Sequence, residues 1–154
     1  MLITSHHRVK VGDFGLVRAT NAEATSDMIV GTVSYLAPEQ VTGEEITPAS
    51  DVYSAGIVLF ELLTGTVPFS GDTPLAHATA RLDSDVPAPS SRISGVPKLV
   101  DALVATATAR DPRERFADAG EFLEALDDVC RELDLPDVTI PVPRNAAAAR
   151  TAQA

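Results

Sequence analysis

Residues 50–69 read SDVYSAGIVLFELLTGTVPF, and this stretch decides the fold class. Between Asp51 and Leu63 apolar side chains fall on nearly every side of a helical turn, which is typical of a helix buried all round. Ser50 is placed to cap the start of this helix, and Gly65 can adopt the left-handed conformation just past its end. We therefore expect a central buried helix around which the rest of the chain packs.

Two acidic residues, Asp51 and Glu61, lie on or near this buried element. Burying a carboxylate is unfavourable unless the group is paired or hydrogen-bonded. Both residues are therefore expected to have partners in other parts of the fold.

Two amphipathic helices are expected further along the chain. Apolar residues recur at helical spacing over 97–109, and a second stripe runs from Phe122 to Leu133 after Asp118 and Glu121, which have the spacing of a capping box. Cys130 is the only cysteine, so an internal disulfide is excluded, and we expect a buried member of the second stripe rather than a reactive thiol. The chain is predicted to be mainly α.

The two ends of the chain have different characters. The runs at 1–4 and 8–11 are β-rich and predict a short N-terminal hairpin. Residues 12–47 show no sustained periodicity, a feature that is usually functional or disordered inside a compact domain. Residues 134–154 are rich in Pro and Ala, so we expect one domain over 1–133 followed by a disordered linker stub.

Composition and charge exclude several classes of function. The 154 residues are 45% hydrophobic and 22% charged, a balance that suits one globular domain. The formal net charge of -10 disfavours nucleic acids and anionic membrane surfaces as partners. The longest uncharged stretch, 28–38, is far shorter than the roughly 20 apolar residues of a spanning helix. With no signal peptide recognisable at the N-terminus, we expect a cytoplasmic location.

Several short motifs follow one another in a specific order. They are Asp13-Phe14-Gly15, Gly31-Thr32, Ala37-Pro38-Glu39, Ser50-Asp51-Val52-Tyr53-Ser54, and Arg115 after Asp111-Pro112. In this order and spacing they resemble the C-terminal lobe of a bacterial eukaryotic-type (Hanks-type) serine/threonine protein kinase, over roughly 1–133. The resemblance implies a helical C-terminal lobe with a short N-terminal β-hairpin.

The resemblance assigns roles in nucleotide binding to the first motif. Asp13 would coordinate the Mg²⁺ that bridges the ATP phosphates, Phe14 would pack under the nucleotide site, and Gly15 would give hinge freedom. Thr25 and Ser26 lie where activation-loop phosphorylation occurs in similar kinases. Thr32 would contact the catalytic loop and shape the pocket for the substrate residue that follows the acceptor hydroxyl.

Three further residues take structural roles by the same resemblance. Glu39 and Arg115 match a buried ion pair that ties the end of the activation segment to the last helices. Asp51 matches an aspartate that accepts backbone N–H bonds from the catalytic loop. Arg113, two positions before Arg115, has no assigned partner and is expected to be an ordinary surface residue.

The kinase reaction needs elements that the 154 residues do not contain. No Gly-x-Gly-x-x-Gly occurs, the only lysines are Lys10 and Lys98, and no catalytic-loop Asp is found, so no catalytic residue is assigned. We expect a partial kinase that is inactive and binds neither ATP nor Mg²⁺ by itself, with open apolar surface that favours self-association. Met1 is either an internal methionine of a longer frame or the start of a remnant gene. The alternative function is a non-catalytic module that docks on a related kinase or on its protein substrates.

Overall fold

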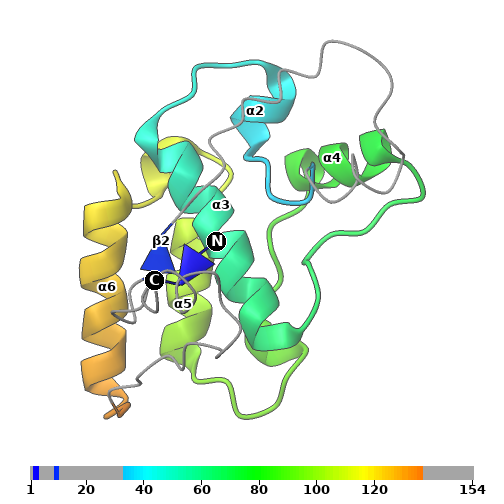
Figure 1. The fold of residues 1–154 in the computed structure, drawn as a ribbon. Helices are drawn as coiled ribbons and strands as arrows, with labels where there is room; N and C mark the ends of the chain where they lie inside the picture. The colour runs from blue at the N-terminus through cyan, green and yellow to red at the C-terminus, as the bar shows by residue number, and fades with distance from the viewer. Residues whose placement is uncertain (1, 4–8, 11–32, 137–154) are drawn as a thin grey trace, which may run out of the picture. The chain divides into compact units, whose positions relative to one another are not determined.

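The computed structural model describes residues 2–3, 9–10 and 33–136, and these are mainly helical, as predicted (Figure 1). Strands β1 (Leu2–Ile3) and β2 (Val9–Lys10) form an antiparallel pair in which Leu2 lies opposite Lys10. This hairpin and the helical body belong to separate compact units.

The described part of the helical body contains five α-helices, and three of them begin at a proline. They are α2 (Pro38–Thr42), α3 (Pro48–Thr64), α4 (Pro74–Asp83), α5 (Lys98–Ala107) and α6 (Ala119–Glu132), with the short 3-10 helices η1 (Pro89–Ser91) and η2 (Pro112–Glu114) between them. Helix α3 packs against α5 and α6, while α2 packs against α4 (Figure 1). The predicted central helix therefore exists and organises the body.

Helix α3 starts earlier than the sequence indicated. Pro48 occupies its first turn, where a fixed φ and a missing N–H are tolerated, and Thr47 is the extended N-cap residue. The prediction that Ser50 caps the helix is wrong, because Ser50 lies inside the first turn and its hydroxyl accepts from the Thr47 N–H at 3.2 Å.

The φ of Gly65 is 76°, which lies in the left-handed region that glycine adopts without strain, and its N–H donates to the Glu61 carbonyl at 2.7 Å. The sequence predicted this end of α3 correctly. The glycine turns the chain out of the helix toward the loop that leads to α4.

The prediction that α3 is buried all round is wrong. Val52, Tyr53, Ile57 and Phe60 are buried, whereas Leu62 on the same helix is 76% exposed. The helices of the described part cover only some of the circumference of α3. The sequence pattern shows that α3 has apolar residues on every side, but it does not show which of these sides pack against another helix.

Two groups of buried residues form the core among the described residues of the helical body. One joins α3, α5 and α6 through Val52, Leu103, Ala107, Phe122 and Val129. The other comprises Ala37, Tyr53 and Ile57 and lies under the residues that precede α2. At Gly56, an added Cβ would lie 2.6 Å from Thr108 Cγ2, so α3 and α5 approach closely because this position has no side chain.

Helix α6 begins at the predicted capping residues, but a residue predicted to be buried near its end is exposed. The Asp118 carboxylate accepts from the backbone N–H groups of Gly120 and Glu121, while the Glu121 carboxylate accepts from the Ala117 N–H. Cys130 is exposed, so the prediction of a buried thiol is wrong. Val129 takes the inward position, and the next residue along a helix is turned by about 100° toward solvent. Among the described helices, none is long and apolar enough to span a membrane.

Candidate functional site

All the residues assigned to nucleotide binding, activation-loop phosphorylation and substrate binding lie outside the described residues. These are Asp13, Phe14, Gly15, Thr25, Ser26 and Thr32. The helical body is described from residue 33 onward, directly after Thr32. Its early residues Ser34 to Glu39 lead into α2, and we call them the anchored segment.

Glu39 and Arg115 are brought together at the end of the anchored segment. The two Nη atoms of Arg115 donate to the two carboxylate oxygens of Glu39 at 2.8 and 2.9 Å. The side chains are 0% and 2% exposed. Arg115 also donates to the carbonyls of Ala49, Ala109 and Arg110. This pair connects α2 to the start of α3 and to the loop that follows α5.

Glu39 keeps its negative charge in this buried position. Burial alone would raise the pKa of its carboxyl, but the hydrogen bonds from Arg115 and from the Ser50 hydroxyl, which donates at 2.5 Å, outweigh burial and lower that pKa. The Arg115 guanidinium also lies 5.0 Å from the centre of the Tyr53 ring. Burial raises the pKa of Tyr53 to about 12, so the phenol beneath the arginine is neutral.

Arg81 of α4 is a second anchor, and the sequence analysis missed it. Its side chain is fully buried, and its Nη1 donates to the backbone carbonyls of Ser34, at 3.3 Å, and Leu36. The guanidinium lies 5.9 Å from the centre of the Phe69 ring. The only signal in the sequence is that Arg81 falls four positions after His77 and three after Ala78, on the face of α4 that turns out to be buried.

His77 contacts the first residue of the anchored segment. Its Nε2 lies 3.0 Å from the Ser34 hydroxyl oxygen. Burial lowers the pKa of His77, and the nearby charge of Arg81 lowers it further. The imidazole is therefore neutral at physiological pH and suited to a hydrogen bond with a hydroxyl.

Tyr35 attaches the anchored segment to α3. Its hydroxyl donates to the Glu61 carboxylate at 2.6 Å, and its carbonyl accepts from the Ser54 hydroxyl at 2.8 Å. The hydrogen bond to Glu61 is the main reason that the pKa of Tyr35 is raised. Glu61 thus has the partner that the sequence analysis required.

Asp51 and Arg113 are both exposed in the structure. Asp51 lies on the mostly buried helix α3, but its own side chain is exposed in the first turn, so its carboxylate needs no partner to offset burial; its role toward a catalytic loop stays a prediction. Its position near the start of the helix points it away from the packed faces that Val52 and Tyr53 occupy. Arg113 is a surface residue, as predicted, but it has a partner, because its Nη2 lies 2.6 Å from an Asp111 carboxylate oxygen.

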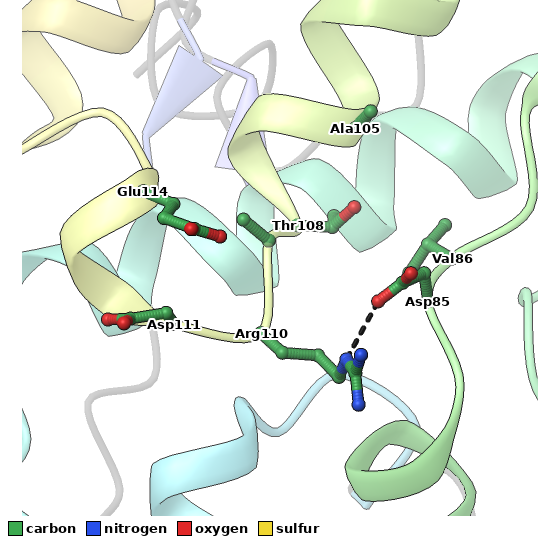
Figure 2. A pocket seen from close by; sticks show the side chains of 8 residues that line it. Asp85, Val86, Ala105, Thr108, Arg110, Asp111 and Glu114 are labelled. Atoms are coloured by element: carbon green, nitrogen blue, oxygen red, sulfur yellow. Dashed lines mark hydrogen bonds and ion pairs between the residues drawn. The ribbon is translucent and has the colours of Figure 1, made fainter.

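A separate cavity of about 430 Å³ lies between the loop after α4 and the end of α5 (Figure 2). Its lining includes Asp85, Arg110, Asp111 and Glu114, and Arg110 Nε donates to Asp85 at 2.7 Å (Figure 2). None of these residues was assigned a role from the sequence. Among the described residues, no group of three His, Cys, Asp or Glu side chains could hold a metal ion.

Comparisons with known proteins agree with the order of motifs in the sequence. Residues 1–126 match the family model described as "Protein kinase domain". The chain is 49% identical over 154 residues to the serine/threonine-protein kinase PknL of Mycobacterium tuberculosis, covering 99% of this chain and 39% of that protein. It is 43% identical over 126 residues to the probable serine/threonine-protein kinase PknB of Bifidobacterium longum, covering 79% of this chain and 18% of that protein. The chain therefore spans well under half the length of the curated relatives it matches.

Proposed function

This chain belongs to the protein kinase domain family, and on that premise we propose that it forms part of the catalytic domain of a serine/threonine protein kinase. The reaction is transfer of the γ-phosphoryl group of ATP to a Ser or Thr hydroxyl of a protein substrate. The residues of this chain would supply the metal-binding aspartate and the surface that receives the substrate. We further propose a cytoplasmic place for this domain.

The observation that supports the proposal most strongly is the buried pair of Glu39 and Arg115. The resemblance to kinases assigned these residues to an ion pair, and they lie 76 positions apart in the sequence. The pair is bidentate, with hydrogen bonds of 2.8 and 2.9 Å. Amino-acid composition and helix content alone would not bring these two residues together in this geometry. It fixes the end of the anchored segment against the helices.

Asp13 is the residue of this chain proposed to hold Mg²⁺. By donor chemistry it fits, because Mg²⁺ takes oxygen ligands and is usually bound through one or two carboxylates together with substrate phosphates. When bound, the ion offsets the charge that develops on the transferring phosphoryl group. Phe14 and Gly15 would complete this side of the nucleotide site.

The other proposed residues act on the substrate side. Phosphate on Thr25 or Ser26 would add up to about two negative charges, which an arginine cluster can hold in one loop conformation. Thr32, directly before the described helical body, would shape the pocket for the substrate residue that follows the acceptor. The 154 residues contain no glycine-rich loop, no lysine in the nucleotide-binding context and no catalytic-loop Asp, so transfer requires these groups from other sequence.

A chimera tests this function. In it, the section of PknL that aligns with residues 1–126 is replaced by those residues, and transfer from labelled ATP to peptides bearing Ser, Thr or Tyr is measured. We expect transfer to Ser and Thr, loss of at least a hundredfold in Asp13→Asn, and no change in Glu124→Gln, which alters an exposed carboxylate of α6. Transfer that survives Asp13→Asn would contradict the proposal. A folded chimera with no transfer would also contradict it and would favour the docking-module alternative.

A further inference from the structure

Arg81 has an unusual environment for a buried arginine. Its side chain is 0% exposed, and none of the ion pairs among the described residues includes it. All its hydrogen-bond partners are backbone carbonyls: Nε donates to Ala78 at 3.0 Å, Nη2 to His77 at 3.3 Å, and Nη1 to Ser34 and Leu36. The positive charge is therefore stabilised by peptide dipoles and not by a carboxylate.

Burial of the Arg81 guanidinium would be hard to explain if this side chain served only to fill space in the core. Burying a cation without a countercharge is unfavourable, and well-packed apolar residues can often replace buried charged groups without loss of stability. An apolar side chain of similar length could fill the space beside Phe69. It could not, however, hold two carbonyls of a neighbouring segment in fixed directions, which a planar guanidinium can do.

The carbonyls of the anchored segment are held from two sides. Those of Ser34 and Leu36 accept from Arg81 of α4, and the carbonyl of Tyr35 between them accepts from the Ser54 hydroxyl of α3 at 2.8 Å. The carbonyl of Val33 accepts from the Leu36 N–H. Four successive peptide groups, directly after Thr32, thus have defined orientations.

We propose that Arg81 is a positioning residue for substrate binding: from α4 it fixes the backbone of Ser34–Leu36, which follows in the sequence on Thr32, the residue proposed to shape the substrate pocket. The effect on substrate binding rests on the proposed function. The fixing of the Ser34–Leu36 backbone by Arg81 does not depend on it. The hydrogen bond between His77 and Ser34 supports the same contact from the same helix. Helix α4 and the anchored segment then act as one unit toward the substrate.

The structural part is tested on the 154-residue chain by hydrogen exchange. The first variant is Arg81→Lys, which keeps the positive charge but lacks the planar guanidinium. The second is Arg81→Met, which keeps an apolar side chain of similar length but has no charge. We expect amide exchange at Ser34–Ala37 to rise at least tenfold in both, while exchange in α5 and α6 stays within twofold. Arg92→Met is the matched control, because Arg92 also donates to carbonyls, those of Val67 and Pro68, far from this segment in the sequence.

The catalytic part is tested in the PknL chimera. We expect KM for a peptide substrate to rise about tenfold in Arg81→Lys with kcat nearly unchanged, since the contact acts on substrate placement and not on the transferring group. Arg92→Met should leave both constants unchanged. An unaltered exchange at Ser34–Ala37 in Arg81→Lys would overturn the positioning role. Faster exchange with an unchanged KM in an active chimera would overturn only its link to the substrate, and an inactive chimera would contradict the proposed function instead.

Discussion

Arg115 follows Glu39 by 76 positions in the sequence, yet its two Nη atoms meet the two carboxylate oxygens of Glu39 at 2.8 and 2.9 Å. Both side chains are almost completely shielded from solvent. The contact joins the first turn of α2, where the anchored segment ends, to the loop between α5 and α6. It makes the orientation of the anchored segment depend on helices that are distant in the sequence.

Replacing Arg115 should destabilise the helical body strongly. Arg115→Ala leaves the Glu39 carboxylate buried without a countercharge, and breaking a buried pair in this way costs about 3 to 5 kcal/mol. Urea unfolding followed by circular dichroism measures the effect. Arg113→Ala is the control, because Arg113 is exposed and pairs only with Asp111 at the surface. Equal small effects of the two substitutions would contradict the role given to Arg115.

Gly56→Ala should destabilise the protein although alanine favours helices. The new Cβ would lie 2.6 Å from Thr108 Cγ2 and 3.0 Å from Ala107 Cβ, and overpacking of this kind costs about 1 to 3 kcal/mol. Thr108→Ser removes the nearer methyl group but keeps the hydroxyl that donates to the Val104 carbonyl. The double variant should therefore recover part of the loss. A Gly56→Ala protein that melts above the unsubstituted chain would show that α3 and α5 are not so close.

Stability should decrease as the pH falls below about 6.5 because of His77. Burial and the charge of Arg81 lower the pKa of His77 in the folded protein, so the unfolded chain takes up a proton at a higher pH than the folded chain does. Above the unfolded pKa the imidazole is neutral in both states and contributes no dependence on pH. Unfolding measured between pH 7.5 and 5.5 should show a steeper loss in the unsubstituted chain than in His77→Gln. Parallel curves would contradict the prediction.

Thr25 or Ser26 should accept phosphate from an intact related kinase. The resemblance to kinases assigns both to the activation loop, and loop hydroxyls are accessible to other enzymes. Mass spectrometry after incubation of the chain with PknL and Mg-ATP identifies the sites. Phosphate found only outside Thr20–Thr32 would count against the assignment.

The sequence predicted the helices more reliably than the directions in which they face. Strong periodicity and capping residues located α5 and α6 within a few positions, and Gly65 marked the end of α3. Burial was harder, because it depends on which neighbours are present: Leu62 and Cys130 continue apolar patterns but are exposed. The start of α3 was misplaced because Pro48 was not recognised as a first-turn residue.

In the candidate site, one long-range contact could be predicted from the sequence and another could not. Glu39 and Arg115 could be paired from the order of motifs, since a family resemblance carries information about distant contacts. Arg81 could not, because its partners are backbone carbonyls, which have no signature in the sequence. A lone arginine among alanines in a short helix ordinarily indicates a solvated face.

The central claim is that one buried ion pair fastens the anchored segment of a kinase domain to the helices behind it. A double-mutant cycle with Glu39→Ala, Arg115→Ala and the double variant, measured by urea unfolding of the 154-residue chain, tests this claim most directly. We predict a coupling free energy of about 2 to 3 kcal/mol, because removal of the second partner relieves the unpaired charge that the first substitution leaves. Effects that add within about 0.5 kcal/mol would contradict the claim.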